Sequence, residues 1–276
     1  MGMIQNLFNI PEFNKPRDLR QLWLKDVGYD EAPYLERMGL TELNDFLSSL
    51  SNRIDMVKIV TNQIMYSPEK WIKEKLSIYK KYNIQPYLDH TYFMIAYKNS
   101  NVVKAIEAAA ELGFEVIEFM NTFGDVSEKQ WDIWRKIATE NNFKIIFEFH
   151  PQHNWNPKLP IKASTAEEII QAADPFFNDG AIKMMIDSDQ FDALGNKSDY
   201  EINKLIKEYS LEKLVFEVES PKKGRDKWHK HLNQYFQKFS PDCNVSNIMP
   251  SQVTIVEALR GGSGWTYSFD KRADLK

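Results

Sequence analysis

Acidic residues recur in this sequence directly after or within short apolar runs, where a carboxylate is rarely buried unless it has a partner. Five such residues stand out: Asp26, Glu118, Glu148, Asp187 and Glu217. Several carboxylates that converge on one place repel each other, and a divalent cation or a buried lysine relieves that repulsion. The sequence therefore indicates a site of clustered acids organised around a cation.

Lys58 is the first candidate for that cation, because it lies inside the apolar run 56–60. An unpaired ammonium there would be costly. We expect Lys58 to pair with the acids, to act as a general base, or to bind a phosphate or carboxylate group. A purely structural ion pair with one glutamate is the alternative, and the spacing does not separate these roles.

A metal ion is the second candidate. Carboxylate oxygens are hard ligands, which favour Mg²⁺ over zinc. The predicted Mg²⁺ ligands are Glu118, Glu148, Asp187 and Glu217. His90 and His150 also follow apolar runs, and with Asp89 and Glu148 they would suit a transition metal instead. Histidines that only form hydrogen bonds at the rim of a site are the simpler interpretation.

Anion binding is expected beside the acids. The segments 219–223 and 244–248 place small or polar residues before expected helices, as phosphate sites do. Arg260 could reach an anion or satisfy the dipole of a helix C-terminus. The predicted contacts to a small anionic substrate are Lys25, Lys222, Asn244, Asn247 and Arg260. The predicted catalytic residues are Lys58, Glu118, Glu148 and His90.

Most of the candidate site residues lie within or directly after apolar runs, and each such run is followed by a helix-like stretch, a pattern that repeats along the chain. The predicted strands are 19–26, 54–60, 84–88, 114–119, 143–149, 181–186, 211–218 and 243–248. The run Val253–Val256 has the same form, yet it falls in a predicted last helix, 251–259. Eight strands alternating with helices predict a closed (β/α)8 TIM barrel, whose active site lies at the C-terminal strand ends.

Composition narrows the class of protein. No linker divides the 276 residues, so a single domain over 1–276 is expected, with an arm at 1–16 and a tail at 262–276. A net charge of −4 with mixed signs argues against nucleic-acid binding. Nothing resembles a signal peptide or a membrane span, and the lone Cys243 forms no intrachain disulfide, which predicts a cytoplasmic protein. Whether it forms a homo-oligomer is left open.

The order and spacing of several segments between about residues 15 and 262 resemble the phosphosulfolactate synthase family. These segments are 15–17, 25–28, 54–58, 113–118, 147–148, 180–181, 215–217, 244–248 and 257–261. The resemblance implies a (β/α)8 barrel and a Mg²⁺-dependent, Michael-type addition of sulfite to phosphoenolpyruvate, giving phosphosulfolactate. Lys58 matches the family's strand-two lysine. Glu118, Glu148 and Glu217 match its strand-end glutamates, and Asp187 stands where the family tends to have glutamate.

The sequence departs from the family at its glycine-rich turns. Gly-Thr-Ser is replaced by Thr61-Asn62-Gln63, Gly-Gly-Thr by Asp89-His90-Thr91, Ser-Asp-Gly by Met120-Asn121-Thr122, and one glycine by His150. Glycines let backbone N–H groups approach an anion, so their loss predicts an altered substrate. The alternatives are a rebuilt barrel enzyme acting on another small molecule, and a non-catalytic relative with a binding or stress-related role.

Overall fold

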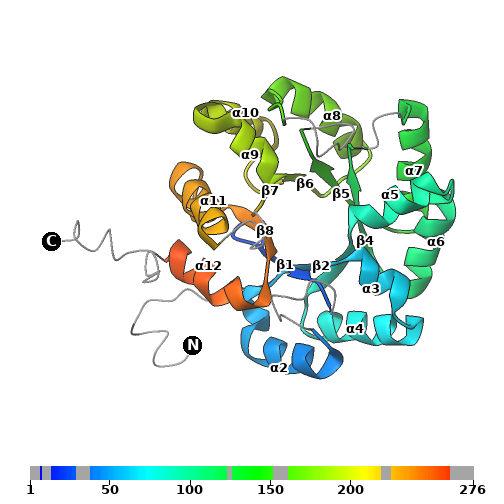
Figure 1. The fold of residues 1–276 in the computed structure, drawn as a ribbon. Coiled ribbons are helices and arrows are strands. Elements are labelled where there is room, and N and C mark those ends of the chain that lie inside the picture. The colour runs from blue at the N-terminus through cyan, green and yellow to red at the C-terminus, as the bar shows by residue number, and fades with distance from the viewer. Residues whose placement is uncertain are drawn as a thin grey trace.

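The computed structural model describes Leu7 and residues 14–28, 38–122, 126–151, 161–218 and 225–261. In this part of the chain, eight parallel strands close into a barrel in sequence order, with helices outside it (Figure 1). The strands are β1 Leu22–Asp26, β2 Met56–Ile59, β3 Gln85–Leu88, β4 Val116–Met120, β5 Lys144–Phe149, β6 Lys183–Ile186, β7 Leu214–Glu217 and β8 Asn244–Ile248. The predicted (β/α)8 TIM barrel is confirmed, and every predicted strand overlaps an observed one.

Helices connect the strands and pack on the outside of the barrel. They are α2 Leu40–Leu50, α3 Thr61–Tyr66, α4 Glu69–Lys81, α5 His90–Lys98, α6 Val102–Leu112, α7 Glu128–Glu140, α8 Ala166–Asn178, α9 Ser188–Leu194, α10 Ser198–Tyr209, α11 Arg225–Lys238 and α12 Val253–Arg260. The run Val253–Val256 thus belongs to a helix, as expected. Within the described ranges, none of the helices has both the length and the apolar character needed to cross a lipid bilayer.

Short helices begin directly at several strand ends, and the sequence did not predict them. α5 and α9 follow β3 and β6 with a single residue between. That residue is an aspartate in both cases: the Asp89 side chain accepts a hydrogen bond from the Thr91 N–H, and Asp187 accepts one from Asp189. These acids therefore combine a helix N-cap with a place at the strand end.

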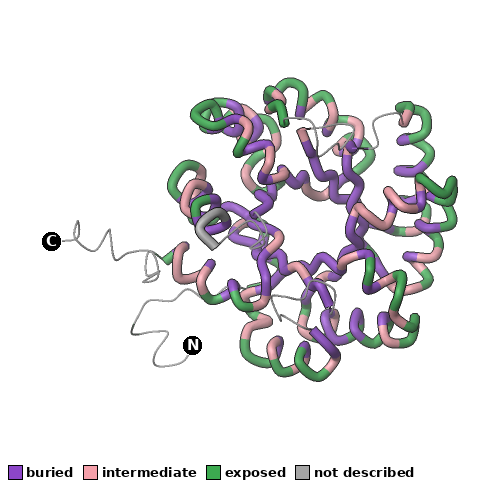
Figure 2. The backbone as a smooth tube through the Cα atoms, in the orientation of Figure 1, coloured by how far each residue is buried: buried purple, intermediate pink, exposed green. Residues whose placement is uncertain are grey.

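Alternation along the strands sorts their side chains into layers. Seven residues form an apolar cluster inside the barrel: Trp23, Met56, Tyr87, Val116, Ile146, Met185 and Val215. Side chains two positions further along a strand face the same way and lie nearer the C-terminal strand ends. The residues so placed are Lys25, Lys58, Asp89, Glu118, Glu148, Asp187 and Glu217. The strands are mostly buried, whereas the exposed residues lie on the outer helices (Figure 2).

Asp26, a predicted site residue, is instead part of a buried structural network. Its carboxylate lies 2.6 Å from Lys75 Nζ and accepts hydrogen bonds from Tyr79 Oη (2.8 Å) and the Gly28 N–H (2.9 Å). Gln63 donates to both its carboxylate and its carbonyl oxygen. Gly28 has φ +58°, and a Cβ there would lie 2.4 Å from the Gln63 side chain. Asp26 thus ties β1 to α3 and α4, and its oxygens are already engaged.

Candidate functional site

The Lys58 ammonium lies among three glutamates from three other strands. Its Nζ is 3.1 Å from Glu118 Oε2, 3.3 Å from Glu148 Oε2 and 3.7 Å from Glu217 Oε1. All four side chains are nearly or fully buried. Buried charges of this kind persist only when they are paired, so the barrel brings the lysine and the acids together as a unit. The structure thereby gathers three of the four predicted catalytic residues.

His90, the fourth, joins the same group from the first turn of α5. Its Nδ1 lies 3.1 Å from Glu118 Oε2, 3.2 Å from Glu148 Oε2 and 3.4 Å from Asp89 Oδ1. Its backbone N–H also donates to Glu118 Oε2, over 3.2 Å. Two cationic side chains and one amide therefore meet a single oxygen of Glu118.

These contacts set the protonation states. Burial lowers the pKa of Lys58, but the charges of Glu118 and Glu148 outweigh it and raise that pKa well above its usual range. His90 likewise has a pKa raised well above normal, against the effect of burial, chiefly by Glu148. Burial raises the pKa of both glutamates, yet Lys58 and His90 bring that of Glu148 below its ordinary range, whereas that of Glu118 rises to about 7.

It follows that Lys58 and His90 are cations near neutral pH and that Glu148 is an anion. Because its amine is already protonated, Lys58 cannot accept a further proton, which argues against the role of general base that the sequence left open. Glu118, with its pKa near 7, can both carry and release a proton.

A second group of acids lies beside the lysine. Carboxylate oxygens of Glu148, Asp187 and Glu217 lie within 4.8 Å of one another. Burial raises the pKa of Asp187, and Glu217 and Glu148 raise it further; burial and Glu148 likewise raise that of Glu217. Carboxyl groups crowded in this way and an oxygen-only donor set fit a hard divalent cation such as Mg²⁺, whose charge would relieve the repulsion between them.

The predicted metal ligands do not form one set. Glu118 groups instead with Asp89 and His90, and a third group holds His150, Asp187 and Asp189. His150 Nε2 is 3.8 Å from Asp189 Oδ2 and 4.0 Å from Asp187 Oδ2. The two histidines therefore belong to different groups, so the alternative set of both histidines with Asp89 and Glu148 is corrected as well.

The predicted substrate contacts divide between the two ends of the barrel. Lys25 is paired in register with Lys58, and its charge lowers the pKa values of Asp89 and Glu217. Asn247 also lies at this end, but its amide donates to Glu217 Oε1. Lys222 lies outside the described residues.

Asn244 and Arg260 were wrongly assigned to the substrate. Both lie at the N-terminal end of the strands, where they satisfy backbone carbonyls. Asn244 donates to Leu214 O, and Arg260 donates to the carbonyl oxygens of Gln21 and Cys243. Arg260 is buried there, and its charge stabilises the closure of β1 against β8 rather than an anion at the opposite end.

Sequence reasoning missed two residues of this region. The Tyr87 ring centroid lies 5.9 Å from Lys58 Nζ, and its buried hydroxyl has no hydrogen-bond partner among the described residues. Asp189 lies near His150 from the first turn of α9. Strand alternation could have found Tyr87, since it stands two residues before Asp89. Asp189 required the unpredicted helix.

Comparisons with known proteins agree on family and fold. Residues 11–264 match the model of a family described as (2R)-phospho-3-sulfolactate synthase (ComA). A phosphosulfolactate synthase from Methanothermobacter thermautotrophicus is 22% identical over 91% of this chain and 92% of that protein. A phosphosulfolactate synthase from Methanocaldococcus jannaschii is 25% identical over 80% of this chain and 86% of that protein.

Among solved structures, KGPDC from Streptococcus mutans superposes with a TM-score of 0.52 at 12% identity, covering 90% of this chain and 99% of that one. N-acetylneuraminate lyase from Mycoplasma synoviae also superposes with a TM-score of 0.52 at 12% identity, covering 92% of this chain and 77% of that one. At such low identity these two structures speak for the shared barrel alone.

The raised pKa of Glu118 predicts a pH-dependent stability. Its pKa is about 7 in the folded protein against 4.5 ordinarily, so the folded chain retains a proton that the unfolded chain loses between these values. The free energy of unfolding therefore falls as pH rises through this window. Glu118→Gln lacks this pH dependence, so whatever its stability at low pH, the difference in free energy of unfolding between the variant and wild type should shift in the variant's favour by on the order of 1–3 kcal/mol as pH rises through the window.

Urea denaturation of metal-free protein at a series of pH values measures this difference. Glu140→Gln, at an exposed position of α7, is the control and should track wild type. A gap between Glu118→Gln and wild type that stays constant with pH would contradict the raised pKa.

Proposed function

The chain belongs to the (2R)-phospho-3-sulfolactate synthase family, and on that premise we propose that it forms a carbon–sulfur bond by adding sulfite to phosphoenolpyruvate or a close relative of it. The observation that carries this proposal is the Lys58 ammonium between Glu118, Glu148 and Glu217. These are the residues at which the sequence follows the family's strand-two lysine and strand-end glutamates. Their convergence supports a retained catalytic centre rather than a scaffold that has lost it.

The proposed reaction needs one proton donor, and Glu118 suits that role. Sulfite sulfur bonds to C3 of the enol ester, and the electron pair of the C2–C3 double bond moves toward the carboxylate. C2 then takes a proton, which closes the addition. Glu118 has a pKa of about 7, so it can give up a proton near neutral pH, and it is held in place by His90 Nδ1 at 3.1 Å.

Lys58 and His90 supply fixed positive charge next to the reacting region. Two anionic reactants would otherwise meet a mouth rich in carboxylates, since Asp89, Glu148 and Asp187 line it together with the proton donor. Cations already oriented by the protein lower the cost of developing negative charge. Lys25, on the neighbouring strand, adds to the same field.

A bound Mg²⁺ is part of the proposal. Glu148, Asp187 and Glu217 would hold it, and it would supply charge that offsets the substrate's carboxylate and phosphate. Asp187 already fixes the start of α9, so its carboxylate is oriented before any ligand binds.

A second candidate is addition to a less charged acceptor. His90 and Asp89 stand where the family has glycines, and their side chains occupy space that bare backbone would leave to a phosphate. The barrel and the lysine–glutamate centre would then serve a rebuilt specificity. A panel of acceptors offered with sulfite separates the two candidates.

The activity prediction is direct. Purified protein with Mg²⁺ should consume phosphoenolpyruvate only when sulfite is present, and ³¹P NMR measures this consumption. Glu118→Gln should lower kcat by about 10²- to 10⁴-fold, as the loss of a general acid does. The matched exposed variant Glu140→Gln should retain full activity. Undiminished turnover in Glu118→Gln would remove it as the proton donor. Failure on phosphoenolpyruvate with turnover of a neutral acceptor would favour the second candidate.

The metal prediction has a readout that is independent of activity. Mg²⁺ added to chelator-treated protein should raise Tm, corresponding to about 2.7 kcal/mol at one hundred times Kd. Because Asp187 and Glu217 must release protons, binding should strengthen as pH rises. Asp187→Asn should abolish the shift, whereas Asp199→Asn, in an exposed ion pair with Lys238, should keep it. An equal shift in both variants, or none in wild type, would contradict this metal site.

A further inference from the structure

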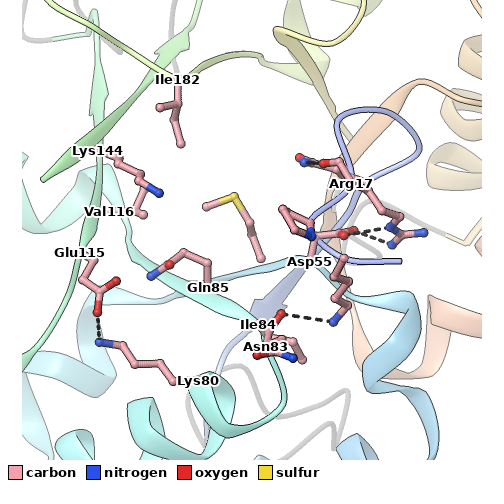
Figure 3. A pocket seen from close by; sticks show the side chains of 14 residues that line it. Arg17, Asp55, Lys80, Asn83, Ile84, Gln85, Glu115, Val116, Lys144 and Ile182 are labelled. Carbon is pink, nitrogen blue, oxygen red and sulfur yellow. Dashed lines mark hydrogen bonds and ion pairs between the residues drawn. The ribbon is translucent and has the colours of Figure 1, made fainter. Parts of the chain in front are cut away.

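A cavity of about 580 Å³ lies at the end of the barrel opposite the lysine–glutamate centre (Figure 3). First residues of four successive strands line it: Met56, Gln85, Val116 and Lys144. The apolar cluster of seven residues fills the barrel between this cavity and the catalytic end. The two ends are thus separate compartments of the same barrel.

The carboxylates that line this cavity are already neutralised. Asp55 receives two hydrogen bonds from the Arg17 guanidinium, of 2.8 and 2.5 Å. Glu115 pairs with Lys80, which also donates to the Gly113 carbonyl. Neither acid is left to repel an incoming anion.

Two donors that line the cavity remain without protein partners. The Gln85 Nε2 is buried and has no hydrogen-bond partner among the described residues. Lys144 is an exposed residue whose ammonium forms no ion pair within the same ranges, whereas the other cations that line the cavity, Lys15, Arg17 and Lys80, are engaged. Figure 3 shows both side chains reaching into the cavity, from β3 and from β5. An unpartnered buried amide is costly, and a ligand oxygen would satisfy it.

Apolar side chains complete the lining. Met56 and Val116, the first residues of β2 and β4, belong to the barrel's apolar cluster, and Ile182, directly before β6, packs against that cluster. A ligand held by Lys144 and Gln85 would rest its remaining atoms on this surface. A fully polar anion would leave the surface uncovered and gain nothing from it.

We propose that this cavity is a second binding site, which takes a small organic carboxylate with a short apolar chain. The carboxylate accepts hydrogen bonds from Lys144 Nζ and Gln85 Nε2, and the chain lies on Met56, Val116 and Ile182. The proposal does not depend on the reaction at the other end of the barrel.

Hexanoate is the probe, with hexanamide as its uncharged counterpart, and binding to the full chain is followed by isothermal titration and ligand-detected NMR. Wild type should bind hexanoate with a Kd of roughly millimolar order and hexanamide more weakly. Lys144→Gln and Gln85→Leu should each weaken hexanoate binding roughly tenfold, as the loss of a hydrogen bond to a charged group does. Lys136→Gln, at an exposed lysine of α7, is the matched control and should bind as wild type does.

Glu118→Gln, at the catalytic end, should also bind hexanoate normally, which separates this site from the proposed reaction. The proposal is overturned if wild type does not bind hexanoate. It is equally overturned if Lys144→Gln binds as tightly as Lys136→Gln, or if hexanamide binds as well as hexanoate.

Discussion

The constraint on which the rest of this structure depends is the burial of one ammonium among three carboxylates. Lys58 lies on β2, and Glu118, Glu148 and Glu217 lie on β4, β5 and β7, so no local segment can satisfy it. Removing either sign from such a group leaves an uncompensated charge in a region that excludes water. The barrel must therefore close in one register for the charges to balance, and that register also forms the end of the barrel at which we place the proposed reaction. The same four side chains therefore contribute to the stability of the barrel and carry the proposed chemistry.

Much of this arrangement was predictable from the sequence, because side chains alternate between the two faces of a strand and one inward-facing residue therefore fixes which others face inward. Once Met56, Val116, Ile146 and Val215 are recognised as inward apolar positions, the residues two further along must face the same interior. That rule places Lys58 and the three glutamates without any knowledge of the fold's helices. The family resemblance added expected roles for these residues, and all eight strands of the barrel were predicted, although the short helices α5 and α9 were not.

The errors have a common physical origin. Asp26, Asn244 and Arg260 have the residue types of a polar site, but the hydrogen-bonding groups of each are already paired with neighbours that only the tertiary structure brings close. Asp26 pairs with Lys75 from α4, whereas Asn244 and Arg260 donate to backbone carbonyls where the barrel closes. The division of the acids into separate groups could not be predicted either. It follows from helices α5 and α9 beginning at the strand ends, where Asp89 and Asp187 act as caps as well as charges.

The most direct test of the central claim is a double-mutant cycle between Lys58→Met and Glu148→Gln, with the free energy of unfolding as the measured quantity. If the ammonium is held by these glutamates, the two changes are strongly non-additive, with a coupling energy above about 1 kcal/mol. The second change then costs little once the first has been made. Additive effects, within the roughly 0.5 kcal/mol expected of independent sites, would contradict the buried centre and the function built on it.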